Sequence, residues 1–179
     1  MRRRYTTTIG LLVILFWIVL ASCGQTRDIA SILNQFPGYH VLTLEDRNPD
    51  LKNFLGKHFP KSNGSVVHAD FDGDGQPDYA LLVRNDELGK AMLLIVLCRA
   101  DGACKKVYDL DVSAYSNSIY VRSVLVGSRV SETATVSTSN RAPVKLGWTG
   151  VRLTYYEQAQ LVLYWNSKLR KIEELQTGD

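Results

Sequence analysis

Apolar residues recur at helical spacing in two stretches that precede a strand-rich body. Asp28 stands as an N-cap at the start of the first stretch, residues 28–36, and Asn48 followed by Pro49 opens the second, residues 48–59. The apolar positions are Ile29, Ile32 and Leu33 in the first stretch and Leu51, Phe54, Leu55 and Phe59 in the second. Each set falls on one face of a helix, so the pattern predicts two helices near the start of the folded body.

From residue 65 onward the pattern changes to the alternation of apolar and polar residues that is typical of β-strands. The predicted strands cover residues 65–71, 79–85, 90–98, 105–112, 118–130, 132–139, 150–157, 160–166 and 169–175, after an earlier alternating run at 39–45. Short connections between consecutive strands favour an antiparallel meander. The predicted fold class is α+β, with one or two N-terminal helices packed on an antiparallel β-sheet in a single globular domain, residues 28–179.

The first 22 residues have a different composition from the rest of the chain. Three arginines, Arg2 to Arg4, precede an uninterrupted apolar run of 13 residues at 9–21. A membrane-spanning helix needs about 20 apolar residues, whereas the apolar region of an export signal needs about 7–15. Residues 1–22 are therefore predicted to be an export signal.

The end of this segment resembles the lipobox of bacterial lipoproteins, because Leu20, Ala21 and Ser22 are followed directly by Cys23. The resemblance implies that the Cys23 thiol is lipidated, that the signal is cut before it, and that residues 23–27 form a short tether. The residue after Cys23 is Gly24 rather than aspartate. In a host with two membranes, this resembles lipoproteins that are sorted by default to the outer membrane, where they face the periplasm. The alternatives are an ordinary cleaved signal with a chance cysteine, or an uncleaved anchor.

Charge narrows the choice of partners. The 179-residue chain carries a formal net charge of +3, and Arg2, Arg3 and Arg4 account for all of it, so the body after the signal is neutral. A neutral body with scattered basic residues does not favour binding to a phosphate backbone. We therefore expect no nucleic-acid partner and instead expect contact with the membrane through the N-terminal lipid.

The remaining two cysteines, Cys98 and Cys104, flank a turn between two predicted strands. Exported proteins meet an oxidising compartment, and a hairpin places such residues across from each other within disulfide reach. Their spacing is not that of a redox C-x-x-C site, and two cysteines do not make a zinc site. The pattern predicts a structural disulfide that contributes about 2 kcal/mol.

Residues 70–78 concentrate negative charge in a loop between two predicted strands. Asp70, Asp72, Asp74 and Asp78 stand at positions 1, 3, 5 and 9 of a calcium-loop pattern, with Gly75 at position 6 and the Gln76 carbonyl at position 7. Calcium takes 6–8 oxygen ligands, and carboxylates this close repel one another without a cation. The alternative is a metal-free acidic turn held by aspartate side chains that accept from backbone N–H groups.

The loop resembles one calcium-loop family more than another. An EF-hand needs glutamate at position 12, where this chain has Leu81, and the flanking segments have strand patterns. The stretch "DFDGDGQPDYALLV" is similar to the strand-loop-strand calcium loop of FG-GAP repeats, of which only one copy is present. The resemblance implies a structural Ca²⁺ site whose ligands are Asp70, Asp72, Asp74, Asp78 and the carbonyl of Gln76.

Other candidate chemistry is sparse. No G-x-S-x-G, P-loop, H-E-x-x-H or dinucleotide-binding motif occurs, and His40, His58 and His68 are isolated in the sequence. The interpretation is a lipid-anchored envelope protein with a structural calcium loop and a non-enzymatic binding or structural role, with a protein partner in the envelope. Two alternatives stay open. One is a small envelope hydrolase with structural Ca²⁺ that uses a histidine such as His68. The other is an inhibitor of an envelope enzyme, acting through a loop such as 131–148.

Overall fold

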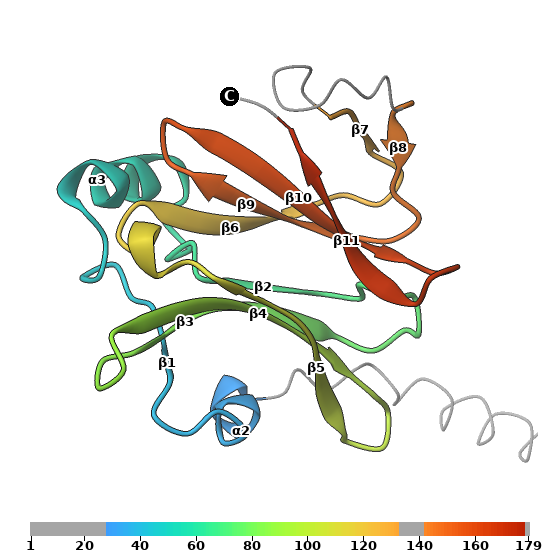
Figure 1. Ribbon diagram of the computed structural model, residues 1–179, viewed down its shortest axis with the longest axis horizontal. Helices are drawn as coiled ribbons and strands as arrows, with labels where there is room; N and C mark the ends of the chain where they lie inside the picture. Colours follow the sequence, from blue (N-terminus) through green and yellow to red (C-terminus); the bar gives the residue numbers. More distant parts are fainter. Residues whose placement is uncertain (1–27, 133–141, 178–179) are drawn as a thin grey trace, which may run out of the picture.

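The computed structural model describes residues 28–132 and 142–177, and it is mostly β (Figure 1). Strands hold 43% of the described residues and helical segments 13%. The predicted α+β class, with N-terminal helices packed on one antiparallel sheet, is therefore wrong. Two antiparallel sheets face each other instead, and the two described α-helices lie apart and form no layer. The predicted strand at 132–139 lies almost wholly outside the described residues.

The first sheet has β3, β4 and β5 joined as consecutive antiparallel hairpins. Two short strands share the remaining edge of β3, because β1 pairs with its C-terminal half and β2 with its N-terminal half. The strands are β1 (His40–Val41), β2 (Val66–Ala69), β3 (Asp78–Asn85), β4 (Lys90–Cys98) and β5 (Cys104–Asp111). Both β3 and β4 are almost entirely buried, which explains why their sequences read as nearly continuous apolar runs.

The second sheet has the order β11–β10–β9–β6, and all its pairs are antiparallel. Its strands are β6 (Ile119–Val124), β9 (Gly150–Tyr155), β10 (Ala159–Asn166) and β11 (Lys171–Gln176). The short 3-10 turn η1 (Ser113–Tyr115) leads into β6. The single strand predicted over 118–130 breaks at a turn in which Gly127 has φ +81°, and the chain resumes as β7 (Arg129–Val130), which pairs with β8 (Val144–Lys145).

The main core lies between the two sheets. It takes the inward-facing residues of both, including Leu82, Ile95, Val121 and Leu153, each at most 2% exposed. The open edges of the sheets also meet. Along one side the Val121 N–H donates to the Gly64 carbonyl beside β2 at 2.7 Å. Along the other, the Tyr108 hydroxyl on β5 donates to Glu174 on β11 at 2.7 Å.

The two helices cover different sheets, and both begin at the predicted caps. Helix α2 (Ile29–Leu33) follows Asp28, and its buried Ile32 packs on the outer face of the first sheet. Helix α3 (Pro49–His58) follows Asn48, whose side chain accepts from the Leu51 N–H at 2.8 Å. Leu51 and Leu55 of α3 pack against Tyr120 on the outer face of the second sheet.

A buried arginine fastens the start of α3 to both sheets. Arg47 is only 5% exposed, and its guanidinium donates to the Ser65 hydroxyl before β2 and to the Ser116 carbonyl before β6, each at 2.7 Å. Burial lowers the pKa of Arg47 to about 10, so the group is still charged at neutral pH.

No helix in the described ranges is long and apolar enough to cross a membrane. The predicted export signal, residues 1–22, and the Cys23 lipidation site with its tether, residues 23–27, lie outside those ranges.

Helix α3 offers a pair of neighbouring substitutions with opposite expected effects. A Cβ added at Gly56 meets nothing within 4 Å, so Gly56→Ala is expected to raise the free energy of unfolding by about 0.5–1 kcal/mol. Leu55 is fully buried, so Leu55→Ala is expected to lower it by about 2–5 kcal/mol. Urea denaturation measures both, and a destabilised Gly56→Ala variant would contradict the placement of Gly56 on the open face.

Candidate metal site

The acidic segment forms the loop of the β2–β3 hairpin. Ala69 and Asp78 are register partners, so residues 70–77 leave and re-enter the sheet at adjacent positions. Gly73 and Gly75 have φ of +85° and +81°, a conformation that glycine adopts without the steric cost that other residues incur. The two glycines therefore let the chain reverse while the aspartates between and around them converge.

Aspartate side chains organise the loop by accepting from its backbone. Asp70 accepts from the N–H of Gly73 at 2.6 Å with Oδ1 and from the N–H of Gly75 at 3.0 Å with Oδ2. Asp72 accepts from the Asp74 N–H at 3.2 Å. These contacts are those that the metal-free interpretation predicts, and they also position Asp70 and Asp72 for a shared ligand.

Asp78 is the buried end of the site. Its side chain is 0% exposed, and it accepts from the Phe71 N–H with Oδ2 and from the Cys98 N–H with Oδ1, each at 2.8 Å. Burial raises the pKa of the Asp78 carboxyl to about 7, and the charges of Asp72 and Asp74 add to this rise. A carboxylate here is costly to ionise unless a positive charge compensates it.

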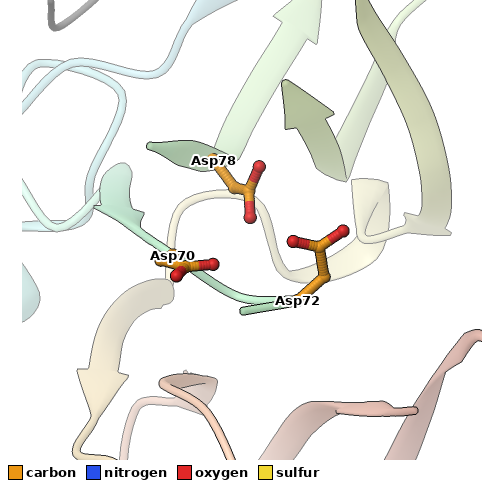
Figure 2. Close-up of side chains that lie close together, drawn as sticks. All are labelled: Asp70, Asp72 and Asp78. Carbon is orange, nitrogen blue, oxygen red and sulfur yellow. The ribbon is translucent and has the colours of Figure 1, made fainter. Parts of the chain in front are cut away.

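Three carboxylates converge at this point. Figure 2 shows the side chains of Asp70, Asp72 and Asp78 turned toward one another, and one ligand oxygen of each lies within 4.8 Å of the other two. Burial raises the pKa of Asp72, and the neighbouring charges of Asp74 and Asp70 raise it further. The group could hold a metal ion, since it presents oxygen ligands at separations that one cation can bridge.

The other two predicted ligands are placed differently. Asp74 lies outside the group of three; one of its carboxylate oxygens accepts from the Gln76 N–H at 2.8 Å and the other lies 4.0 Å from Arg99. Gln76 is half-buried. Three of the four predicted aspartates therefore come together, and the fourth faces a basic side chain that sequence spacing did not point to.

A tryptophan from the opposite half of the molecule covers the loop. A Cβ added at Gly73 would collide with the ring of Trp148, so the indole rests directly on the loop backbone. Trp148 belongs to the segment between β8 and β9 and is 41% exposed. The contact joins the two sheets at the candidate site. No local pattern signals it, because it depends on how the sheets stack.

A disulfide lies at the adjoining end of the first sheet. Cys98 and Cys104 are bonded and are register partners at the end of the β4–β5 hairpin, with Cα atoms 4.0 Å apart. Because the Cys98 N–H donates to Asp78, the disulfide and the acidic group share one residue.

Comparison with known proteins adds no assignment: no family model, no curated protein and no solved structure matches this chain. The site is therefore interpreted from its own residues.

The contact between Gly73 and Trp148 predicts that alanine lowers the free energy of unfolding by different amounts at two glycines of the same loop. Both have positive φ, so alanine at either costs about 1–3 kcal/mol of backbone strain. A Cβ at Gly75 meets nothing within 4 Å, whereas one at Gly73 collides with Trp148. Gly73→Ala is therefore expected to lower the free energy of unfolding by more than Gly75→Ala does. When Trp148→Ala is added to both variants, urea denaturation should give them the same free energy of unfolding. A difference that persists would contradict the contact.

Proposed function

We propose that this chain is a lipid-anchored protein of a bacterial cell envelope that binds Ca²⁺ in the 70–78 loop and has a non-enzymatic binding or structural role. The observation that carries the calcium proposal is the convergence of Asp70 and Asp72 on the fully buried carboxyl of Asp78. Three carboxylates at this separation repel one another, and one sits where water cannot screen its charge. A hard divalent cation relieves both costs, and carboxylate oxygens are its preferred ligands.

The geometry favours a structural role for the ion. Asp78 already joins the loop to the end of β4, and Trp148 joins the loop to the second sheet. A cation held by Asp70, Asp72 and Asp78 stiffens a point at which both sheets meet. Further oxygens come from water or from the Gln76 carbonyl, and Asp74 reaches the ion if its carboxylate leaves Arg99.

The part of the chain that the structure describes contains no comparable cluster of side chains for the hydrolase alternative. His68 is exposed and stacks on Tyr79 with ring centroids 6.5 Å apart, and His40 lies 3.9 Å from Asp86. His68 shares a pocket with Ser62 and Ser123, but within the described ranges it makes no hydrogen bond to either hydroxyl. The inhibitory loop proposed over 131–148 falls partly outside those ranges.

Calcium dependence separates a cation site from a metal-free turn. Asp72 accepts one weak hydrogen bond, so Asp72→Ala is expected to lower Tm clearly in calcium and only slightly in chelator. Thermal melting of the purified protein in both buffers measures this, with calorimetric titration of Ca²⁺ alongside. Tryptophan emission provides a second signal, since the ring of Trp148, one of three tryptophans, rests on the loop.

Asp101→Ala is the matched control for this experiment. Asp101 also accepts from a backbone N–H, that of Ala103 at 2.9 Å, in a different turn. Its removal should change Tm equally in calcium and in chelator. Equal losses for Asp72→Ala in the two buffers, without saturable binding at several millimolar Ca²⁺, would reduce the loop to an acidic turn.

Lipid attachment is tested by metabolic labelling with palmitate in a bacterial host. Labelled protein is expected for the full chain and no label for Cys23→Ala, because the lipobox resemblance places the acyl groups on that residue. Ser22→Ala is the control, since alanine also suits a position that accepts small residues. Label that persists in Cys23→Ala would exclude Cys23 as the acceptor.

A further inference from the structure

Two arginines lie side by side on the outer face of the second sheet. Arg122 of β6 and Arg152 of β9 are direct register partners. Their neighbours Val121 and Leu153 point into the core between the sheets, so both arginine side chains point outward. Like charges directly opposite each other in a sheet are destabilising, so this pair has a cost that an anion would remove.

Neither arginine has an acidic partner in residues 28–132 and 142–177. No ion pair or hydrogen bond is made by either guanidinium there, although each carries five N–H donors. The Nε of Arg152 is buried and has no acceptor. Outside those ranges, residues 1–27 and 133–141 contain no aspartate or glutamate, and Asp179 at the end of the chain is the only acidic residue.

The acid on the same face is already engaged. Glu173 of β11 accepts from the Tyr164 hydroxyl and from the Asn166 amide, each at 2.8 Å, and lies 3.8 Å from Lys171. It is also two strands away from Arg152, because β10 lies between β9 and β11. A buried guanidinium nitrogen without an acceptor is expensive. The Nε of Arg47 has the same cost, but the other nitrogens of Arg47 donate to Ser65 and Ser116, whereas Arg152 makes no such bond in the described residues.

The surroundings hold Arg122 in place and leave space beside it. Its guanidinium carbon lies 4.0 Å from the centroid of the Phe59 ring, a cation–π contact at the end of α3. Arg122 and Phe59 line a pocket of about 270 Å³ together with Leu55, Ser62, Tyr120 and Ser123. Figure 1 shows α3 and the β7–β8 hairpin over opposite ends of this sheet, and the register places the two arginines on the strands between these ends.

We propose that Arg122 and Arg152 form a binding site for an oxyanion, a phosphate or carboxylate group carried by a small ligand whose apolar part occupies the adjoining pocket. Planar guanidinium groups bind such oxyanions through paired, charge-assisted hydrogen bonds. The Nε of Arg152 supplies a donor that is already desolvated, and the hydroxyl of Ser62 supplies a further donor at the pocket. No residue of the acidic loop belongs to the arginine pair or lines this pocket.

Inorganic phosphate is the first probe, titrated into the purified full chain in calcium-free buffer and compared with acetate and with chloride at matched ionic strength. Phosphate, acetate or both are expected to raise Tm with a saturable dependence, whereas chloride does not. Arg122→Gln is expected to weaken binding about tenfold or more, since each charge-assisted contact contributes about 1.5–3 kcal/mol.

The variants also distinguish a binding site from a structural pair. In chloride, Arg122→Gln is expected to change Tm little, because relief of the repulsion within the pair offsets loss of the contact with Phe59. Lys168→Gln removes the same charge from an exposed turn and should retain the response to phosphate. The proposal is overturned if the double variant Arg122→Gln, Arg152→Gln responds to both oxyanions as the parent does, or if neither anion raises the parent's Tm above chloride.

Discussion

The carboxyl of Asp78 is the constraint on which the rest of the arrangement depends. It is fully buried at the start of β3, and it accepts one backbone N–H from the 70–78 loop and one from the end of β4. Two hydrogen bonds from neutral donors only partly offset the loss of water around a carboxylate. The surrounding residues must therefore supply either a proton or a positive charge, and the convergence of Asp70 and Asp72 on the same point favours a cation.

The site joins parts of the molecule that are far apart in the sequence. Asp78 connects the loop to Cys98 and so to the disulfide hairpin, and Gly73 receives the ring of Trp148 from the other sheet. A change in the loop is thus felt at the interface between the sheets. The arginine pair lies on the outer face of the second sheet, and the acidic loop contributes no residue to it.

Local chemistry was predictable from the sequence, but the assembly of the sheets was not. The caps at Asp28 and Asn48 and the meander from residue 150 onward agree with the structure, because capping and alternation depend on near neighbours. Alternation identifies the faces of a strand but not the sheet that it joins, so the division into two sheets was missed. The helical pattern over 28–36 also overstated α2, which ends at Leu33 before Pro37 and Gly38. Trp148 and Arg99 reach the acidic loop through tertiary packing, which has no signal in the local sequence.

The contacts between the edges of the two sheets affect whether copies of this protein associate at high concentration. An unpaired outer strand offers its N–H and C=O groups to any neighbouring chain and is a common origin of aggregation. Here β6 is turned toward β2 and β5 toward β11, with Val121 bonded to Gly64 and Tyr108 to Glu174, while β1 and β2 are only 2 and 4 residues long. The edge strands of each sheet are thus covered by those of the other sheet. For a protein that we propose is confined to a membrane surface, this closure favours separate molecules over intermolecular sheets.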